Sequence, residues 1–171
     1  MAGNLEYVSS TTITSAVSSV TLTGIDDDSV YMFTYTNMTS STDSATGLYF
    51  RFTVGGSADD SSEYDYSDLD LRATETFGED YAENQTVLSL AWATGNDTGE
   101  QDGGIFYIYN ANSSSEWTFA TYESYYMVSD PKLRGRQGGL AFTDTSAVDG
   151  VHLYWSHGNI TSGTFALYKV V

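Results

Sequence analysis

Most of the side chains that could do acid–base chemistry are carboxylates. The chain has 171 residues, with 23 Asp and Glu and only six Lys and Arg. Two carboxyl groups that face each other across a cleft form the catalytic pair of glycoside hydrolases. One group of carboxylates lies in loop-like sequence, where exposed acids that keep the chain soluble are the simpler interpretation. Its members are Glu63, Asp65, Asp68, Glu75, Glu79 and Asp80.

Nucleophilic catalysis finds little support. The chain has no Cys, which also excludes disulfides and thiolate metal sites. Its two histidines, His152 and His157, lie near the C-terminus, the first in an expected strand and the second in an expected turn. No Gly-x-Ser-x-Gly elbow is present, although a Ser/His/Asp triad is recognised by geometry rather than by sequence order. The sequence therefore predicts a protein that is not an enzyme and needs no cofactor.

The loop from Asn96 to Gly103 contains oxygen ligands that suit calcium. It lacks the Asp-x-Asp-x-Asp-Gly spacing of an EF-hand, so a solvated loop is the favoured interpretation. Calcium binding by this acidic loop stays open at this point.

Two groups of residues are candidates for an interface. Lys132, Arg134 and Arg136 hold three of the six positive charges and follow Pro131 in a predicted loop. They either pair internally with Asp130 and nearby carboxylates or dock on an acidic patch of another subunit. The aromatic candidates suit sugar stacking or protein contact, unless they merely reflect the high β propensity of Tyr. They are Tyr122, Tyr125 and Tyr126.

The net charge of −17 indicates which partners to exclude. Nucleic acids and anionic membranes are bound through basic patches, so neither is an expected partner. No stretch approaches the length of about 20 apolar residues that crosses a membrane. The start of the chain, Met1 to Glu6, has neither the basic region nor the apolar run of a signal peptide.

Short runs rich in Val, Ile, Thr, Tyr and Phe alternate with clusters of Ser, Gly, Asp and Asn, and this pattern is typical of strands and turns. Leu69 and Leu71 flank Asp70, which indicates one face in and one face out. The segments 55–67 and 93–103 are expected to be long polar loops. The expected strands, about ten in number, are 20–23, 30–36, 48–54, a segment around 69–71, 87–92, 105–109, 117–122, 140–143, 151–155 and 164–170.

Regularly spaced short strands without helical periodicity predict an all-β protein. We expect a single domain over residues 1–171 that forms an antiparallel, jelly-roll-like β-sandwich with little or no helix. The first and last strands should both lie in the core sheets. Gly158-Asn159 is expected to form a tight turn between the last two strands, so that Ile160, Phe165 and Leu167 cover the core.

The C-terminal segment from Ala147 to Tyr168 resembles the closing module of many virion proteins of tailed bacteriophages, mainly phages of aquatic bacteria. In those proteins an apolar strand is followed by S-x-G-N-I, S-G-T and a final L-Y, and here the run is Ser156 to Tyr168. The segments 18–25, 48–52 and 104–110 are similar to other strands of that family in the same order. The chain departs from the pattern at Lys169, where a Gly is usual.

The resemblance implies a non-enzymatic virion structural protein on the outer surface of the particle, made in the host cytoplasm. Capsid decoration (cement) or head-appendage proteins are the leading expectation, and a tail-fibre or receptor-binding protein that binds carbohydrate is the alternative. The expected partners are the major capsid protein or other virion proteins. Self-association is also expected, with a trimer slightly preferred over a dimer. The family supplies no catalytic residues.

Overall fold

The computed structural model describes residues 4–45 and 47–171, so the first three residues considered for a signal peptide lie outside it. Its regular elements are all strands, and the described residues contain no helix. The strands are β1 (Leu5–Ile13), β2 (Ser19–Thr23), β3 (Tyr31–Ser40), β4 (Leu48–Val54), β5 (Ser57–Ala58), β6 (Tyr64–Arg72), β7 (Gly78–Gln85), β8 (Leu88–Ala91), β9 (Asp102–Tyr109), β10 (Thr118–Met127), β11 (Leu133–Phe142), β12 (Val148–Trp155) and β13 (Ile160–Val170).

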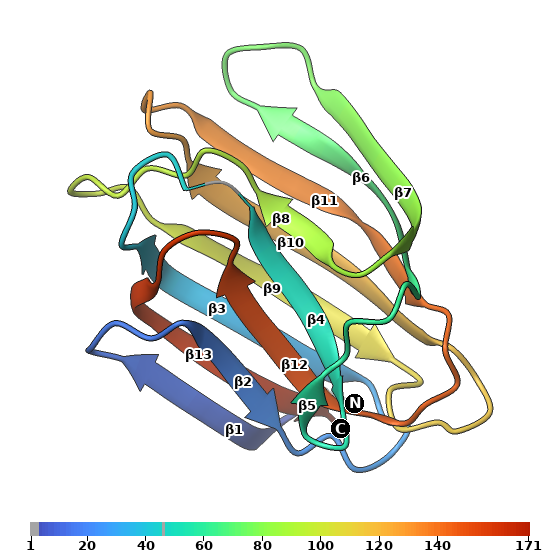
Figure 1. Cartoon of the computed structure of the whole chain (residues 1–171). Coiled ribbons are helices and arrows are strands. Elements are labelled where there is room, and N and C mark those ends of the chain that lie inside the picture. Colours follow the sequence, from blue (N-terminus) through green and yellow to red (C-terminus); the bar gives the residue numbers. More distant parts are fainter. Residues whose placement is uncertain (1–3, 46) are drawn as a thin grey trace.

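Two antiparallel sheets pack face to face, which confirms the predicted β-sandwich (Figure 1). The large sheet has eight strands in the order β1-β13-β3-β9-β10-β11-β6-β7. The smaller sheet has the order β2-β12-β4-β5, and β8 also pairs with β4. The chain passes repeatedly between the two sheets, as it does in jelly-roll-like sandwiches. The two ends of the described chain lie together, since β1 pairs with β13.

Alternation of side chains explains why most strands were predictable. In β10, every second residue from Thr118 to Tyr126 is buried and those between are exposed. Three strands, β1, β5 and β7, were not predicted. The sequence of β7, Gly-Glu-Asp-Tyr-Ala-Glu-Asn-Gln, is almost entirely polar because this strand forms an edge of the sheet. The predicted loop 55–67 is wrong in part, since it contains β5 and the start of β6.

A continuous set of aromatic rings joins the two sheets. Phe50 of the smaller sheet stacks on Phe106 of the large sheet, with ring centroids 4.5 Å apart and planes 11° apart. Phe106 in turn stacks on Tyr122, and Phe52 packs edge-on against Phe142. Each of these rings is buried. Buried aromatic pairs contribute about 0.5–1.5 kcal/mol beyond the burial of their area, so this set stabilises the sandwich.

The closing strands behave as the sequence predicts. Gly158 has a φ of 90°, which glycine adopts readily, and it lies between the end of β12 and the start of β13. Asn159, the other residue of the expected turn, does not have a positive φ. Ile160, Phe165 and Leu167 are all fully buried in the core.

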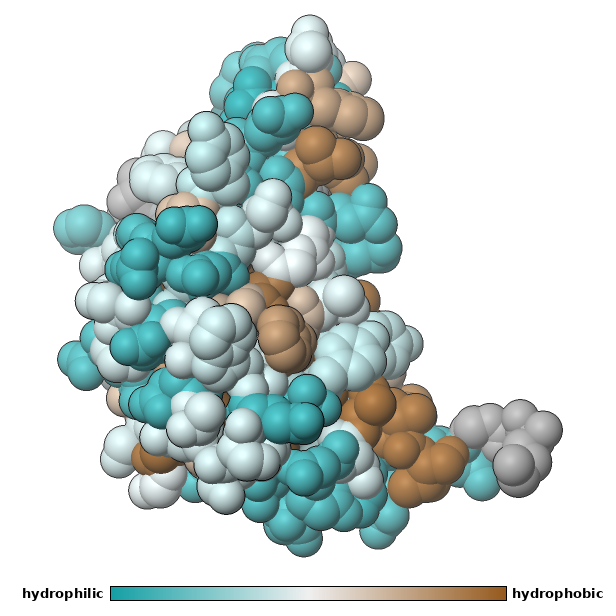
Figure 2. Space-filling view, turned by 90° about the vertical axis from the view of Figure 1, so that its right-hand side faces the viewer, coloured by the Kyte–Doolittle hydropathy of each residue, from teal (hydrophilic) through white to brown (hydrophobic). Residues whose placement is uncertain are grey.

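One side of the molecule, seen in Figure 2, is mostly polar. It is teal and white over most of its area, and brown hydrophobic residues gather in only a few places. Within the described ranges, no helix has the length and hydrophobicity to span a membrane.

Two neighbouring glycines of β11 provide a test of the packing. A Cβ on Gly138 would lie 2.3 Å from the Cβ of Asp68 and 2.4 Å from the carbonyl oxygen of Ser67, whereas a Cβ on Gly139 would meet nothing closer than 3.8 Å. We expect Gly138→Ala to lower the free energy of unfolding by about 1–3 kcal/mol, because the backbone of β6 must move. Gly139→Ala should change it by less than about 0.5 kcal/mol. Urea unfolding measures both, and equal effects would contradict the packing described here.

Candidate functional site

The outer face of the large sheet, which points away from the smaller sheet, carries a group of exposed aromatic rings. Strand alternation puts them there, because each inner neighbour belongs to the core. Tyr81 is the most exposed of them at 75%, on the edge strand β7. The described residues show no ring–ring contact for any member of the group. The members are Tyr81, Tyr107, Tyr109, Phe119 and Tyr125.

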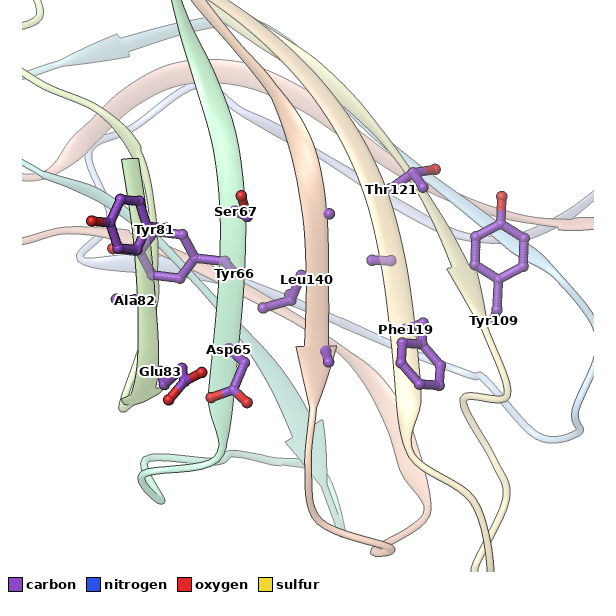
Figure 3. A pocket seen from close by; sticks show the side chains of 13 residues that line it. Asp65, Tyr66, Ser67, Tyr81, Ala82, Glu83, Tyr109, Phe119, Thr121 and Leu140 are labelled. Carbon is purple, nitrogen blue, oxygen red and sulfur yellow. The ribbon is translucent and has the colours of Figure 1, made fainter. Parts of the chain in front are cut away.

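The strand register arranges outer residues in rows across the sheet. One row runs from Tyr81 through Ser67, Gly139 and Thr121 to Tyr107. The next row includes Asp65, Ala141, Phe119 and Tyr109. A depression of about 660 Å³ lies over these rows. Figure 3 shows Tyr81 on one side of it and Phe119 and Tyr109 on the other.

The floor of the depression is low because its residues are small. Ser67, Gly139 and Ala141 lie in the lining between the aromatic sides. Asp65 and Glu83 supply two carboxylates to the same lining (Figure 3). The Asp65 Oδ1 atom accepts a 2.7 Å hydrogen bond from the backbone N–H of Asn84, which holds this carboxylate at the rim. The arrangement offers aromatic faces together with hydrogen-bond acceptors and contains no basic side chain.

Two of the three tyrosines predicted for an interface are not at the surface. Tyr122 and Tyr126 are only 2% and 1% exposed, because their positions in β10 face the core. Tyr125, between them in register, faces outward and is 46% exposed. The prediction is therefore wrong for Tyr122 and Tyr126, and Tyr125 alone is available to a partner.

The basic cluster is a set of internal ion pairs. Lys132 pairs with Asp130 at 2.7 Å, and Arg134 pairs with Glu75 at 3.5 Å. Arg136 is buried and cannot contact another subunit. Internal pairing, one of the two interpretations of this cluster, is confirmed. The predicted loop is wrong for Arg134 and Arg136, which lie in β11.

Arg136 is the centre of a buried polar network. Its guanidinium donates to the Oδ2 of Asp68 at 3.0 Å, to the Oδ2 of Asp80 at 2.7 Å and to the carbonyl oxygen of Ser89. Tyr122 donates to the same Asp68 oxygen at 2.5 Å. Burial raises the pKa of the Asp68 carboxyl, and the hydrogen bond from Tyr122 and the charge of Arg136 oppose this shift. The network joins four strands, β6, β7, β10 and β11, with β8 through Ser89.

The network also sets which residues of β6 face inward. Asp68 and Asp70 are buried, whereas Leu69 is 43% exposed on the outer face. The alternation around Asp70 was predicted, but the polar residues occupy the inner face and Leu69 the outer one. Arg136 explains this reversal, since an unpaired buried guanidinium is costly and Asp68 supplies its partner.

The catalytic candidates are dispersed. His152 lies in β12, where its Nδ1 is 2.7 Å from the Thr21 hydroxyl, and His157 lies in the turn beside Ser156. Among the carboxylates, Asp68 and Asp80 bind Arg136, and Glu75 binds Arg72 at 3.1 Å. The structure thus uses these acids in ion pairs. Glu63 accepts a hydrogen bond from Thr143, and Glu79 lies on the exposed part of β7.

The acidic loop before β9 is closed by its own hydrogen bonds. Glu100 accepts a 2.9 Å bond from the backbone N–H of Asp97, and the Glu100 N–H donates to the Asp97 carbonyl. Asp102 is completely buried, and burial raises the pKa of its carboxyl well above the ordinary value. Over residues 4–45 and 47–171, no three His, Asp or Glu side chains are grouped to hold a metal ion.

The residues that form the depression were missed at the sequence level. Tyr81 belongs to a strand that was not predicted, and Phe119 and Tyr109 were predicted only as strand residues. The signal that could have found Phe119 is the alternation of β10, which puts it on the opposite face from Tyr122. Tyr81 had no such signal, because only the register with β6 shows which way it points.

No family model matches the chain, and no curated protein matches it. The exo-inulinase from Aspergillus awamori, a solved structure, is similar to it with a TM-score of 0.45 and 13% identity. The match covers 99% of this chain and 30% of the enzyme chain, so the chain spans less than a third of the length of that protein. A likeness this distant carries no argument about activity.

Removal of Arg136 tests the network. We expect Arg136→Met to lower the free energy of unfolding by about 3–5 kcal/mol at pH 7, because the Asp68 carboxylate loses its buried partner. The matched control Arg134→Met should cost less than about 1 kcal/mol, since its ion pair with Glu75 is partly exposed.

The deficit of Arg136→Met should shrink as the pH falls towards 4. Without Arg136 the pKa of Asp68 is raised further above its unfolded value, so the ionisation cost is present above the unfolded pKa and disappears once both states are protonated. Urea unfolding at pH 7 and pH 4 measures this. A deficit that grows on acidification would contradict the assigned role.

Proposed function

We propose that the protein is a non-enzymatic structural protein on the outer surface of a tailed-phage particle, most simply a capsid decoration or head-appendage protein. The observation that carries the proposal is the uncovered outer face of the large sheet, with its exposed aromatic rings. The smaller sheet covers only one face of the large sheet, so the opposite face of the large sheet is exposed and can contact a partner. The resemblance of the segment 147–168 to virion proteins is the reason for proposing that this location is a phage particle.

The distribution of charge supports an external location. Five of the six basic side chains, all of them in the described residues, form ion pairs with carboxylates of this chain. The sixth, Arg51, lies over the Tyr154 ring and donates to the Thr86 carbonyl. Because the basic groups are engaged and the net charge is −17, the surface repels nucleic acid, which favours a position away from the genome.

The proposal includes self-association, with trimers preferred, and partnership with the major capsid protein or other virion proteins. The two edge strands of the large sheet, β1 and β7, differ in how readily they can contact another chain. β7 carries Glu79, Asp80 and Glu83, and charges on an edge strand discourage pairing. β1 carries only Glu6 as a charge and exposes Leu5 and Tyr7. β1 is therefore the edge that favours contact with another chain.

Particle composition tests the location. In purified particles of the phage that encodes this chain, we expect mass spectrometry to detect the protein in hundreds of copies, because a decoration protein follows the capsid lattice. A few to tens of copies would favour the alternative, a tail-fibre or receptor-binding protein. Complete absence from the particles would sink both.

Absence of turnover tests the non-enzymatic part. We expect no release of reducing ends from host polysaccharide by the purified protein, because the carboxylates Asp68, Glu75 and Asp80 are engaged in ion pairs. The measurement is a reducing-sugar assay over prolonged incubation. Multiple turnovers that disappear in Asp65→Asn or Glu83→Gln would show that the protein is an enzyme.

A further inference from the structure

The depression on the large sheet is long enough to hold an elongated ligand. It extends from Tyr81 on β7 across β6 and β11 to Phe119 on β10, and Tyr109 continues it on β9. Neighbouring strands lie about 4.8 Å apart, and Tyr81 and Phe119 lie in adjacent rows about 7 Å apart along the strands, so their Cα positions are separated by about 16 Å. This is the span of a short oligomer rather than of a single small ring.

The aromatic groups lie at the sides of the depression, and small residues lie between them. Ser67, Gly139 and Ala141 leave the middle of the sheet low. Tyr81 is 75% exposed and Phe119 is 43% exposed, so both rings are open to a ligand. Flat apolar rings, separated by a low floor of small residues and accompanied by two carboxylates, suit a ligand that has apolar faces and hydroxyl edges at the same time.

The polar groups of the depression select the charge of the ligand. Asp65 and Glu83 are the ionisable groups of the depression's lining apart from the tyrosines, and both are acids. A second depression of about 570 Å³, beside the first, adds Glu123 and Gln137, which are joined by a 2.7 Å hydrogen bond. Carboxylates accept hydrogen bonds from hydroxyl groups and repel anions. The ligand must therefore donate hydrogen bonds and carry no negative charge.

We infer that this face binds an uncharged glycan, with its chain lying across the strands and its sugar rings on Tyr81 and Phe119. The inference rests on the proposed function, in which the outer face of the large sheet is a contact surface, and it names a ligand for that face. Sugars present C–H faces that pack on aromatic rings and hydroxyl groups that donate to Asp65 and Glu83. A second copy of this chain does not fit on this face, because an identical face would bring Asp65 and Glu83 of one copy against those of the other. The proposed contact between copies uses the edge strand β1 instead.

The test begins with the full chain on an array of neutral, sialylated and sulfated oligosaccharides in physiological salt. We expect binding to neutral glycans. Titration calorimetry with the strongest neutral ligand then compares variants. Tyr81→Ala and Phe119→Ala should each weaken binding about five- to ten-fold, since one aromatic contact contributes up to about 1.5 kcal/mol. Tyr81→Phe, which keeps the ring, should bind nearly as the wild type does.

Trp92→Ala is the matched control. Trp92 is an exposed aromatic residue, 46% exposed, that lies directly after β8 on the side of the smaller sheet and does not line the depression. Its removal should leave the affinity unchanged. Melting curves of all variants show that the fold is intact, which is expected because the replaced side chains are exposed.

Three results would overturn the inference. They are no binding to any neutral glycan, binding of sialylated or sulfated glycans only, and neutral-glycan binding that Trp92→Ala weakens as much as Tyr81→Ala does. None of these results bears on the presence of the protein in particles, so the proposed function and the glycan site fail independently.

Discussion

The buried ion pair between Arg136 and Asp68 is the interaction on which the arrangement of the large sheet depends. A guanidinium inside a sandwich requires carboxylates, and β6 supplies them only when Asp68 points inward. A shift of one residue would turn every side chain of β6 to the other face. The pair thus fixes the register of β6, and with it that of the edge strand β7, whose Asp80 binds the same guanidinium.

The outer face follows from that register. With Asp68 inside, Ser67 faces outward beside Tyr81, and Leu69 is exposed in the next row. The low floor and the aromatic side at β7 therefore depend on a charge pair buried beneath them. A buried ion pair adds little net stability compared with a well-packed apolar core, but the loss of one partner is strongly destabilising. The aromatic set around Phe106 holds the two sheets together and leaves the register to the polar network.

Ion pairing within the chain also decides which charges remain on the surface. The few basic side chains are engaged with acids of the same chain, while the remaining carboxylates cover the surface. An acidic surface with one uncovered aromatic face suits a protein that is exposed at high copy number and recognises an uncharged partner. The glycan site is proposed from this combination, whereas the location on a phage particle is proposed from the resemblance of residues 147–168 to virion proteins.

The sequence by itself determined the fold class, because alternating apolar residues and turn-forming clusters have few solutions other than a sandwich. It also located most core strands, including β13 with Phe165 and Leu167. The polar edge strand β7 has no such pattern, so only pairing with β6 revealed it. Tertiary structure decided the fate of the candidate residues: it buried Arg136, Tyr122 and Tyr126 and exposed Tyr125. The physical reason is that alternation tells which residues share a face, whereas only the partner across the core tells which face is inside.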